Sequence, residues 1–404
     1  MSRVAGVDLE PIFDSRGQPT VEATVVLSSG ARGRAGAPSG ASTGRHEARA
    51  FPQDGVPGAL RTFREKLRSR LLGLEASLPT FDQALRDADG TPDLSQVGGN
   101  TATALSVAAA LALADESHQP LWRLLARPGV DGTVFPAVVG NCLNGGRHAI
   151  GGPDIQEFLA VARGPDPEAS VRAALRVHAL VGEALRARQP GAALGRGDEG
   201  GWVAGIGNVE AFELLRSACD RARDELGTDV RPGTDLAASE FCQDGRYRYR
   251  EQTLDTDGQR RFVEELVERF GLVYVEDPFD QEAFPAFAEL TRSVGGRTTV
   301  VGDDLYVTQA ERFRRGIELR ASNAILVKVN QVGTLTSTLG TVDLARAHGI
   351  ATVTSHRSGD LPEGWLSHLA LASGAWGLKC GLLGGERVAK LNELLRLGRP
   401  TSPV

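Results

Sequence analysis

The chain has 404 residues, more than one ordinary domain needs, with a formal net charge of −6. Hydrophobic residues make up 41% and charged residues 24%, values near globular averages that argue against disorder. The negative net charge does not favour binding to nucleic acid or to an anionic membrane. The sequence also shows no apolar core of a signal peptide and no transmembrane run, so we expect a soluble cytoplasmic protein. The four cysteines lack C-x-x-C spacing and are expected to be free thiols.

Residues 1–130 show the pattern of a small α+β domain. An alternating, strand-like run occupies 20–30, and a Gly/Ser/Thr-rich loop, PSGASTG, follows at 38–44. The Ala/Leu-rich segment 102–125 predicts one long helix, which Pro and Gly at 128–129 end.

Residues 131–404 have a different rhythm, in which short β-branched runs alternate with amphipathic segments. The runs include FPAVVGN, GLVYVEDP, RTTVVGDD, NAILVKVN and IATVTSH, and the amphipathic segments include RFVEELVERFG and TSTLGTVDLARAHG. This alternation predicts an α/β fold with a mainly parallel sheet, and the number of units suits a closed β/α barrel.

Polar residues stand at or just after the ends of the apolar runs. They are Asp235, Glu276, Asp303, Lys328, His356 and Lys379. The C-terminal ends of barrel strands form the face that carries chemistry, so these distant residues are expected to meet at one mouth.

Three of these residues, Asp235, Glu276 and Asp303, are carboxylates. Three like charges in one mouth repel one another unless a cation neutralises them, and oxygen ligands favour a hard ion such as Mg²⁺. Each of them alone could instead be a helix cap or a turn residue. Their shared position at successive strand ends favours the metal site.

Lysine is rare in this chain, with only Lys66, Lys328, Lys379 and Lys390 among 45 basic residues. Lys66 and Lys390 lie in helical sequence and are expected to be solvated, whereas Lys328 and Lys379 end strand-like runs. An arginine stays charged, but burial and a nearby cation lower the pKa of a lysine, so that one of these two can act as a base. With a metal that stabilises an enolate, this set predicts removal of a proton α to a carboxylate.

Two further acids, Glu157 in DIQEF and Glu199 in GRGDEGG, could protonate a leaving hydroxyl with help from His148 or His356. Elimination of water would then follow proton abstraction. Arg357 and Ser358 after His356 supply a guanidinium and a hydroxyl suited to phosphate, and the loop at 38–44 could close over a ligand. Alone, each of these last two features is weak.

The motifs taken together resemble the enolase family. The resemblance covers almost the whole chain in order, through DSRGQPTVE, PSGASTG, DGTPD, NGGRHA, QEF, GDEGG, DLAASEF, VEDPFDQ, VGDDLYVT, LVKVNQVGTL, SHRSG and ERVAKLNELLR. It implies a modified β/α barrel capped by a smaller α+β N-terminal domain. It also implies two Mg²⁺ ions and the dehydration of 2-phosphoglycerate to phosphoenolpyruvate in glycolysis.

The resemblance also implies a role for each site residue. The proton-transfer residues are Lys328 as base, Glu199 as acid with Glu157 beside it, and the histidines His148 and His356. The ligands of the first metal are Asp235, Glu276 and Asp303, and Ser42 reaches the second. The substrate-binding residues are Lys379 at the carboxylate, Arg357 and Ser358 at the phosphate, with Gln156 and Ser42.

The family forms dimers, and two charge pairs predict a homodimer here. Glu22 with Arg396 keeps one intersubunit pair of the family, and Glu10 with Arg399 fits a second pair with the charges exchanged.

Several flanking segments depart from the family pattern, above all CGLLGG at 380–385, which is shorter and lacks an arginine. These changes favour an alternative, a carboxyphosphonoenolpyruvate synthase-type enzyme of phosphonate biosynthesis that uses the same site on a phosphonate. A non-catalytic relative that serves as a binding protein would be expected to have lost Lys328, Glu199 or a metal ligand, and all of them are retained.

Overall fold

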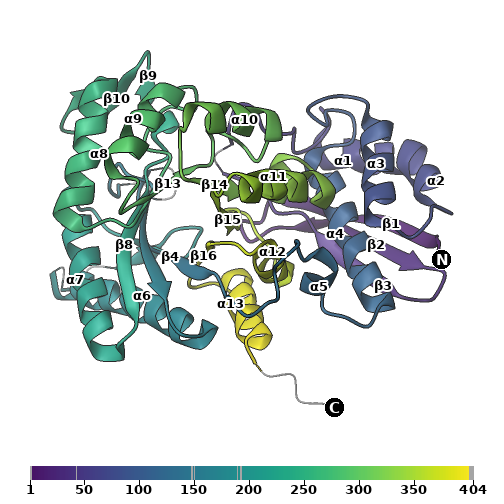
Figure 1. Cartoon of the computed structure of the whole chain (residues 1–404), viewed down its shortest axis with the longest axis horizontal. Coiled ribbons are helices and arrows are strands. Elements are labelled where there is room, and N and C mark those ends of the chain that lie inside the picture. The colour runs from purple at the N-terminus through teal and green to yellow at the C-terminus, as the bar shows by residue number, and fades with distance from the viewer. Residues whose placement is uncertain are drawn as a thin grey trace.

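The computed structural model describes residues 2–41, 43–146, 149, 151–188, 190–191 and 193–399. Figure 1 shows a barrel surrounded by helices at the left and a smaller N-terminal part at the right. The helices α11 (Leu335–Ala347) and α12 (Trp365–Ser373) lie between the two.

The N-terminal part is an antiparallel sheet covered by helices. Its strands, in sheet order, are β1 (Val4–Phe13), β2 (Pro19–Leu27) and β3 (Arg32–Gly36). Its helical elements are α1 (Gly55–Thr62), η1 (Phe63–Leu67), α2 (Arg68–Leu71), α3 (Leu78–Asp89), α4 (Gly99–Glu116) and α5 (Leu121–Leu125). The Ala-rich α4 approaches β3 so closely that a Cβ on Gly33 would lie 2.0 Å from Ala108 O.

The prediction of a single helix over 102–125 is wrong. Helix α4 ends at Glu116, and α5 begins only at Leu121. Pro120 separates them, because proline lacks an N–H and disfavours helical geometry in the residue before it.

Eight strands of the described chain form the predicted closed barrel. In chain order they are β4 (Ala137–Asn144), β5 (Glu157–Arg163), β8 (Asp229–Asp235), β12 (Tyr274–Glu276), β13 (Thr299–Gly302), β14 (Ala324–Val327), β15 (Ala351–Ser355) and β16 (Gly377–Gly381). Pairing between β16 and β4 closes the ring. The remaining α-helices of the described chain are α6 (Pro167–Arg188), α7 (Asn208–Leu226), α8 (Thr256–Phe270), α9 (Phe284–Val294), α10 (Ala310–Leu319) and α13 (Gly385–Leu397).

The sheet is mainly parallel, as predicted, but β5 runs antiparallel to both of its neighbours, β4 and β8. The start of β5 therefore lies at the same end of the barrel as the C-terminal ends of the parallel strands. We call this end the mouth. Below it, alternate inward-facing residues fill the barrel with a small apolar cluster of Val139, Leu159, Val161, Tyr274, Val301, Ala324, Leu326 and Val353.

The expectation that Lys390 is solvated is wrong, although Lys66 is exposed as predicted. Lys390 is only 3% exposed, and its ammonium lies 3.0 Å from an Asp360 carboxylate oxygen. It also donates to the backbone oxygens of Leu361, Glu363 and Glu386. Lys390 thus ties α13 to the segment that follows β15.

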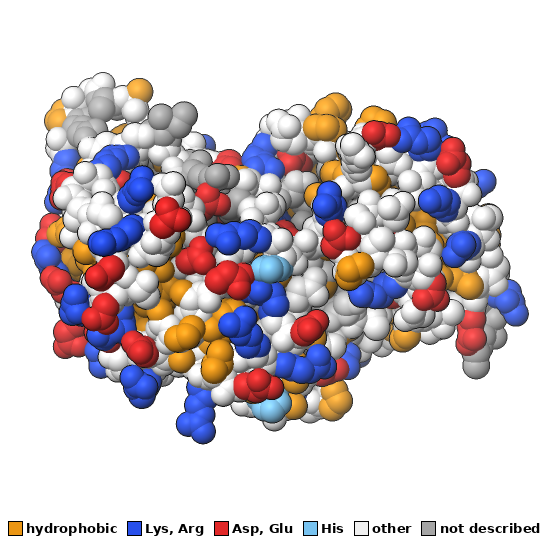
Figure 2. All heavy atoms as spheres, turned by 90° about the horizontal axis from the view of Figure 1, so that it is seen from above, with side chains coloured by type: hydrophobic (Ala, Val, Ile, Leu, Met, Phe, Trp, Pro, Cys, Tyr) orange, Lys and Arg blue, Asp and Glu red, His pale blue; other side chains and the backbone are white. Residues whose placement is uncertain are grey.

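Acidic and basic side chains are interspersed over the face seen in Figure 2. Many form exposed ion pairs such as Arg172 with Glu168, 2.6 Å apart on α6. Pairs of this kind contribute at most about 1 kcal/mol each. All four cysteines are free thiols, as predicted. Among the described helices, none combines the length and apolar character needed to cross a membrane.

Candidate active site

Three carboxylates are in register across neighbouring strands at the mouth. Asp235, the last residue of β8, pairs with Glu276 at the end of β12 and with Glu157 at the start of β5. All three side chains are buried. The antiparallel direction of β5 is the reason that a residue at the beginning of a strand joins two that end strands.

The ammonium of Lys379 lies among these carboxylates. Its Nζ is 2.8 Å from Asp235 Oδ2, 2.8 Å from Glu157 Oε2 and 2.9 Å from both oxygens of Glu276. Tyr274 donates its hydroxyl to Glu276 Oε2 at 2.5 Å. Lys379 is the third residue of β16, so it projects from within a strand rather than from its end.

The second site lysine, Lys328, directly follows β14 and forms a short ion pair with Asp303, which directly follows β13. Gln331 donates to the other oxygen of Asp303 at 2.9 Å. Each lysine at the mouth is therefore paired with predicted metal ligands.

The protein groups around Lys328 and Lys379 do not produce the predicted lowering of a lysine pKa. Burial lowers the pKa of Lys328, but the adjoining Asp303 outweighs it and raises that pKa above its ordinary value. Burial opposes the charge of Lys379 too, yet Asp235, Glu157 and Glu276 raise its pKa well above the ordinary range. Each ammonium therefore balances the charge of the carboxylates beside it.

The donor set fits a divalent cation. Burial and then the neighbouring Asp235 raise the pKa of Glu276 to about 8, and burial and then Asp303 raise that of Asp304 to about 8. Burial and mutual repulsion favour the protonated form of these carboxylates even beside the two lysines, and a hard cation would relieve the repulsion. The ammonium of Lys379 among oxygens of Asp235 and Glu276 shows that these ligands already surround a positive charge.

A second acidic group lies beside this set and was missed in the sequence. Oxygens of Asp277, Asp303 and Asp304 lie within 4.8 Å of one another. Asp277 accepts from the backbone N–H groups of Asp303, at 3.0 Å, and Asp304, at 2.8 Å. The overlooked residues Asp277 and Asp304 each directly follow a predicted ligand, in VEDP and VGDD. These pairs of adjacent acidic residues could have indicated the second group from the sequence.

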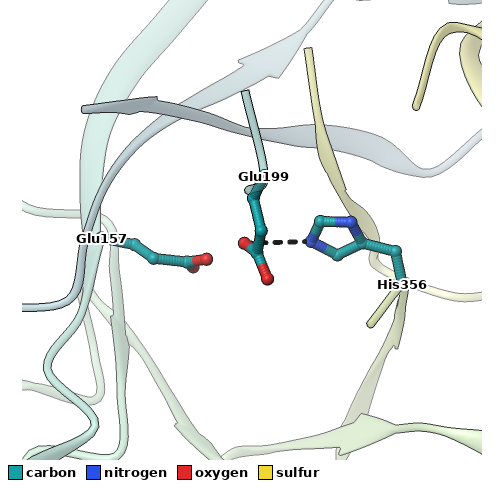
Figure 3. Close-up of side chains that lie close together, drawn as sticks. All are labelled: Glu157, Glu199 and His356. Carbon is teal, nitrogen blue, oxygen red and sulfur yellow. Dashed lines mark ion pairs between the residues drawn. The ribbon is translucent and has the colours of Figure 1, made fainter. Parts of the chain in front are cut away.

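Glu157, Glu199 and His356 converge on another side of the mouth (Figure 3). His356 Nε2 is 3.4 Å from Glu199 Oε2, and Asn141 donates to both glutamates, at 3.0 Å to Glu157 and 3.3 Å to Glu199. Burial, followed by the Glu199 charge, raises the pKa of Glu157 well above its ordinary range. Burial and the Glu199 charge therefore favour the protonated form of Glu157.

Arg357 and Ser358 contact the N-terminal part. Arg357 donates to both carboxylate oxygens of Glu47, at 3.0 and 3.2 Å. Ser358 Oγ accepts from the backbone N–H of Ala41 at 2.5 Å. The loop predicted to close over a ligand thus lies against the barrel mouth at these points.

The structure brings most of the predicted site together. One pocket is lined by Gln156, Glu157, Glu199, Asp235, Asp303, Lys328, His356, Arg357, Ser358 and Lys379. Glu276 adjoins it through Lys379, and Ser42 and His148 lie outside the described residues. Gln156 Oε1 is buried without a hydrogen-bond partner in the described structure, as expected for an atom that awaits a ligand.

Two family models match this chain. The model "Enolase, N-terminal domain" matches residues 4–125, and "Enolase, C-terminal TIM barrel domain" matches residues 132–400. The chain belongs to the enolase family. The resemblance seen in the sequence motifs is confirmed.

Curated proteins named Enolase match this chain along nearly its whole length. The Methanothermobacter thermautotrophicus protein is 46% identical over 403 residues, which cover 98% of this chain and 96% of the relative. The proteins of Halorubrum lacusprofundi and Natronomonas pharaonis are 45% and 44% identical, each covering 98% of this chain and 99% of the relative.

These matches support the predicted Mg²⁺-dependent lyase with enolase activity. The alternative of a carboxyphosphonoenolpyruvate synthase is not favoured.

Proposed function

We propose that this enolase-family chain converts 2-phosphoglycerate to phosphoenolpyruvate and water, with Lys328 as the base and Glu199 as the acid. The main observation in support of these roles is the position of Lys328 and Glu199 around the barrel. Lys328 follows β14, whereas Glu157, which adjoins Glu199, begins β5. On one side β13, β12 and β8 lie between these strands, and on the other β15, β16 and β4. Base and acid thus face a substrate at the centre from opposite sides.

The elimination needs two proton movements. Lys328 Nζ removes the proton from the carbon next to the substrate carboxylate, and Glu199 gives a proton to the hydroxyl, which leaves as water. Lys328 must be neutral to act, so its ion pair with Asp303 has to be relieved first. Asp235, Glu276 and Asp303 would hold Mg²⁺, which when bound would supply positive charge that stabilises an enolate at the substrate carboxylate.

The remaining roles are assigned by chemistry. Lys379 balances the substrate carboxylate, Arg357 and Ser358 hold the phosphate, and Gln156 offers its unpartnered oxygen to the substrate hydroxyl. Glu157 shares its proton with Glu199. Ser42 as a ligand of a second Mg²⁺ and His148 as a further site histidine remain predictions from the family resemblance.

Three wider features belong to this proposal. The capping domain spans 1–130 and the catalytic barrel 131–404. The enzyme acts in the cytoplasm, without nucleic acid or membrane partners.

We propose a homodimer with intersubunit pairs Glu22 with Arg396 and Glu10 with Arg399. Within the chain Glu22 lies 3.6 Å from Arg34, and the adjacent β1 exposes Phe13 to 72%. Equilibrium sedimentation should give a dimer at micromolar concentration. A monomer would contradict this part of the proposal.

A direct assay tests the function. Phosphoenolpyruvate formation from 2-phosphoglycerate with Mg²⁺ should be followed by absorbance, and the expected turnover is near the ordinary enzyme rate of ~10 s⁻¹. The assay is then repeated with phosphonoformate present. An enolase should turn over 2-phosphoglycerate without this phosphonate. Negligible turnover by the Mg²⁺-loaded enzyme would contradict the assignment.

A further inference from the structure

Arg387, in the first turn of α13, is fully buried beside the proposed acid. Its Nη1 lies 2.6 Å from His356 Nδ1 and donates to Arg357 O at 2.6 Å. Its Nη2 donates to Ser358 O at 2.6 Å and to Asp198 O at 3.1 Å. The guanidinium therefore contacts both the segment after β15 and the residue before Glu199.

These contacts decide which nitrogen of His356 carries a proton. A guanidinium can donate but cannot accept, and the second group at Nδ1, the backbone N–H of Gly381 at 3.4 Å, is also only a donor. Nδ1 must therefore present its lone pair. The proton of the neutral ring is then on Nε2, the atom that faces Glu199 (Figure 3).

The tautomer matters for the acid. With the proton on His356 Nε2, the histidine donates to Glu199 and cannot take the proton that Glu199 must give to the leaving hydroxyl. With the proton on Nδ1, Nε2 would accept that proton in a hydrogen bond and withdraw it from the substrate. A fixed donor also holds the carboxyl in one orientation.

We propose that Arg387 is a positioning residue for the elimination, acting through His356 by fixing its Nε2–H tautomer toward Glu199. The inference rests on the proposed role of Glu199 as acid. It concerns a residue that does not line the substrate pocket.

The environment of His356 favours a neutral imidazole ring near neutral pH. Burial lowers the pKa of His356 to about 4, Glu199 and Asp360 oppose this effect, and Arg387 adds to it. Asp360 is itself held by Arg387 at 3.3 Å and by Lys390 at 3.0 Å. The carboxylate of Asp360 is therefore balanced by two cations of α13 rather than by a protonated His356.

The segment at 380–385 supports this arrangement. A Cβ on Gly381 would lie 2.2 Å from Glu199 O, and a Cβ on Gly200 would lie 2.2 Å from Leu383 O. The glycines thus permit close contact between this segment and the loop that carries the acid. Gly381, which supplies the second donor to Nδ1, is fixed by the same contact.

The tautomer can be read directly by ¹⁵N NMR of the side-chain nitrogens in the intact enzyme, with His356 assigned by loss of its signals in His356→Gln. The wild type should show a neutral ring with the proton on Nε2 from about pH 6 to pH 8. An Nδ1–H signal, or titration near the ordinary histidine pKa, would overturn the proposal. This measurement needs neither substrate nor turnover, so it stands apart from the test of the proposed function.

Variants extend the test. Arg387→Met removes the donor and should mix the His356 tautomers and lower kcat about a hundredfold with little change in KM, whereas Arg387→Lys keeps a donor and should restore much of both. Exchange of the substrate α-proton should continue, because Lys328 is untouched. Arg172→Met, which removes an exposed arginine, is the control. A folded Arg387→Met enzyme with an unchanged tautomer and kcat would refute the proposal, and if this variant does not fold, the wild-type spectrum decides.

Discussion

Lys379 Nζ lies 2.8 Å from Asp235 Oδ2, so a protein cation occupies the position at which carboxylates of β8 and β12 converge. The same oxygens would serve a divalent ion, and Lys379 beside them is placed to meet a substrate carboxylate.

Asp235→Asn should weaken Mg²⁺ binding about a hundredfold, because it removes one of three anionic ligands. Calorimetric titration of the apoenzyme with Mg²⁺ measures the effect, and chelation with EDTA should abolish turnover. Asp229→Asn, at the opposite end of the same strand, is the matched control and should bind Mg²⁺ as the wild type does. Equal affinities for the two variants would contradict the assigned ligand.

The two lysines in helical sequence should respond differently to removal of their charge. Lys390→Met removes the buried ammonium that contacts Asp360 and three backbone oxygens and should lower the free energy of unfolding by ~3 kcal/mol. Lys66→Met, at an exposed position, should change it by less than about 0.5 kcal/mol. Urea unfolding of both variants provides the comparison, and similar midpoints would refute the buried role of Lys390.

The stability contributed by neutral His178 should fall on acidification before the ordinary carboxylates titrate. Burial lowers the pKa of His178, whose Nε2 donates to Gly200 O at 2.8 Å. Because the unfolded chain binds a proton near the ordinary pKa of 6.5 and the folded chain does not, this contribution is complete above pH 6.5 and is lost as the pH falls below it.

His178→Gln keeps an N–H donor but cannot titrate, so its melting temperature should fall less steeply between pH 6.5 and about pH 5 than that of the wild type. The control His348→Gln replaces an exposed histidine and should keep the wild-type slope. A steeper loss in His178→Gln than in the wild type would contradict the buried neutral state of His178.

The sequence predicted those site residues that lie at the C-terminal ends of parallel strands. Asp235, Glu276, Asp303 and Lys328 could be placed at one mouth, because parallel strands bring their C-terminal ends together. No such rule covers β5, whose reversed direction brings Glu157 to that mouth from the start of a strand.

Residues whose roles depend on tertiary contacts were not predictable in this way. Arg387 and Lys390 lie in an amphipathic pattern typical of a surface helix, and nothing local shows that their charges are buried against Asp360. The role of the segment at 380–385 likewise could not be predicted, because it depends on close contact with the loop that carries Glu199.

With Lys328 as the base and Glu199 as the acid, replacement of these two residues should affect proton removal differently. The most direct test is exchange of the α-proton of 2-phosphoglycerate with deuterated solvent, measured by NMR in the Mg²⁺-loaded enzyme. Wild type and Glu199→Gln should both exchange this proton, because Lys328 removes it before the hydroxyl leaves, whereas Lys328→Ala should exchange it at least ~10³-fold more slowly. Exchange by Lys328→Ala at the wild-type rate would contradict the mechanism.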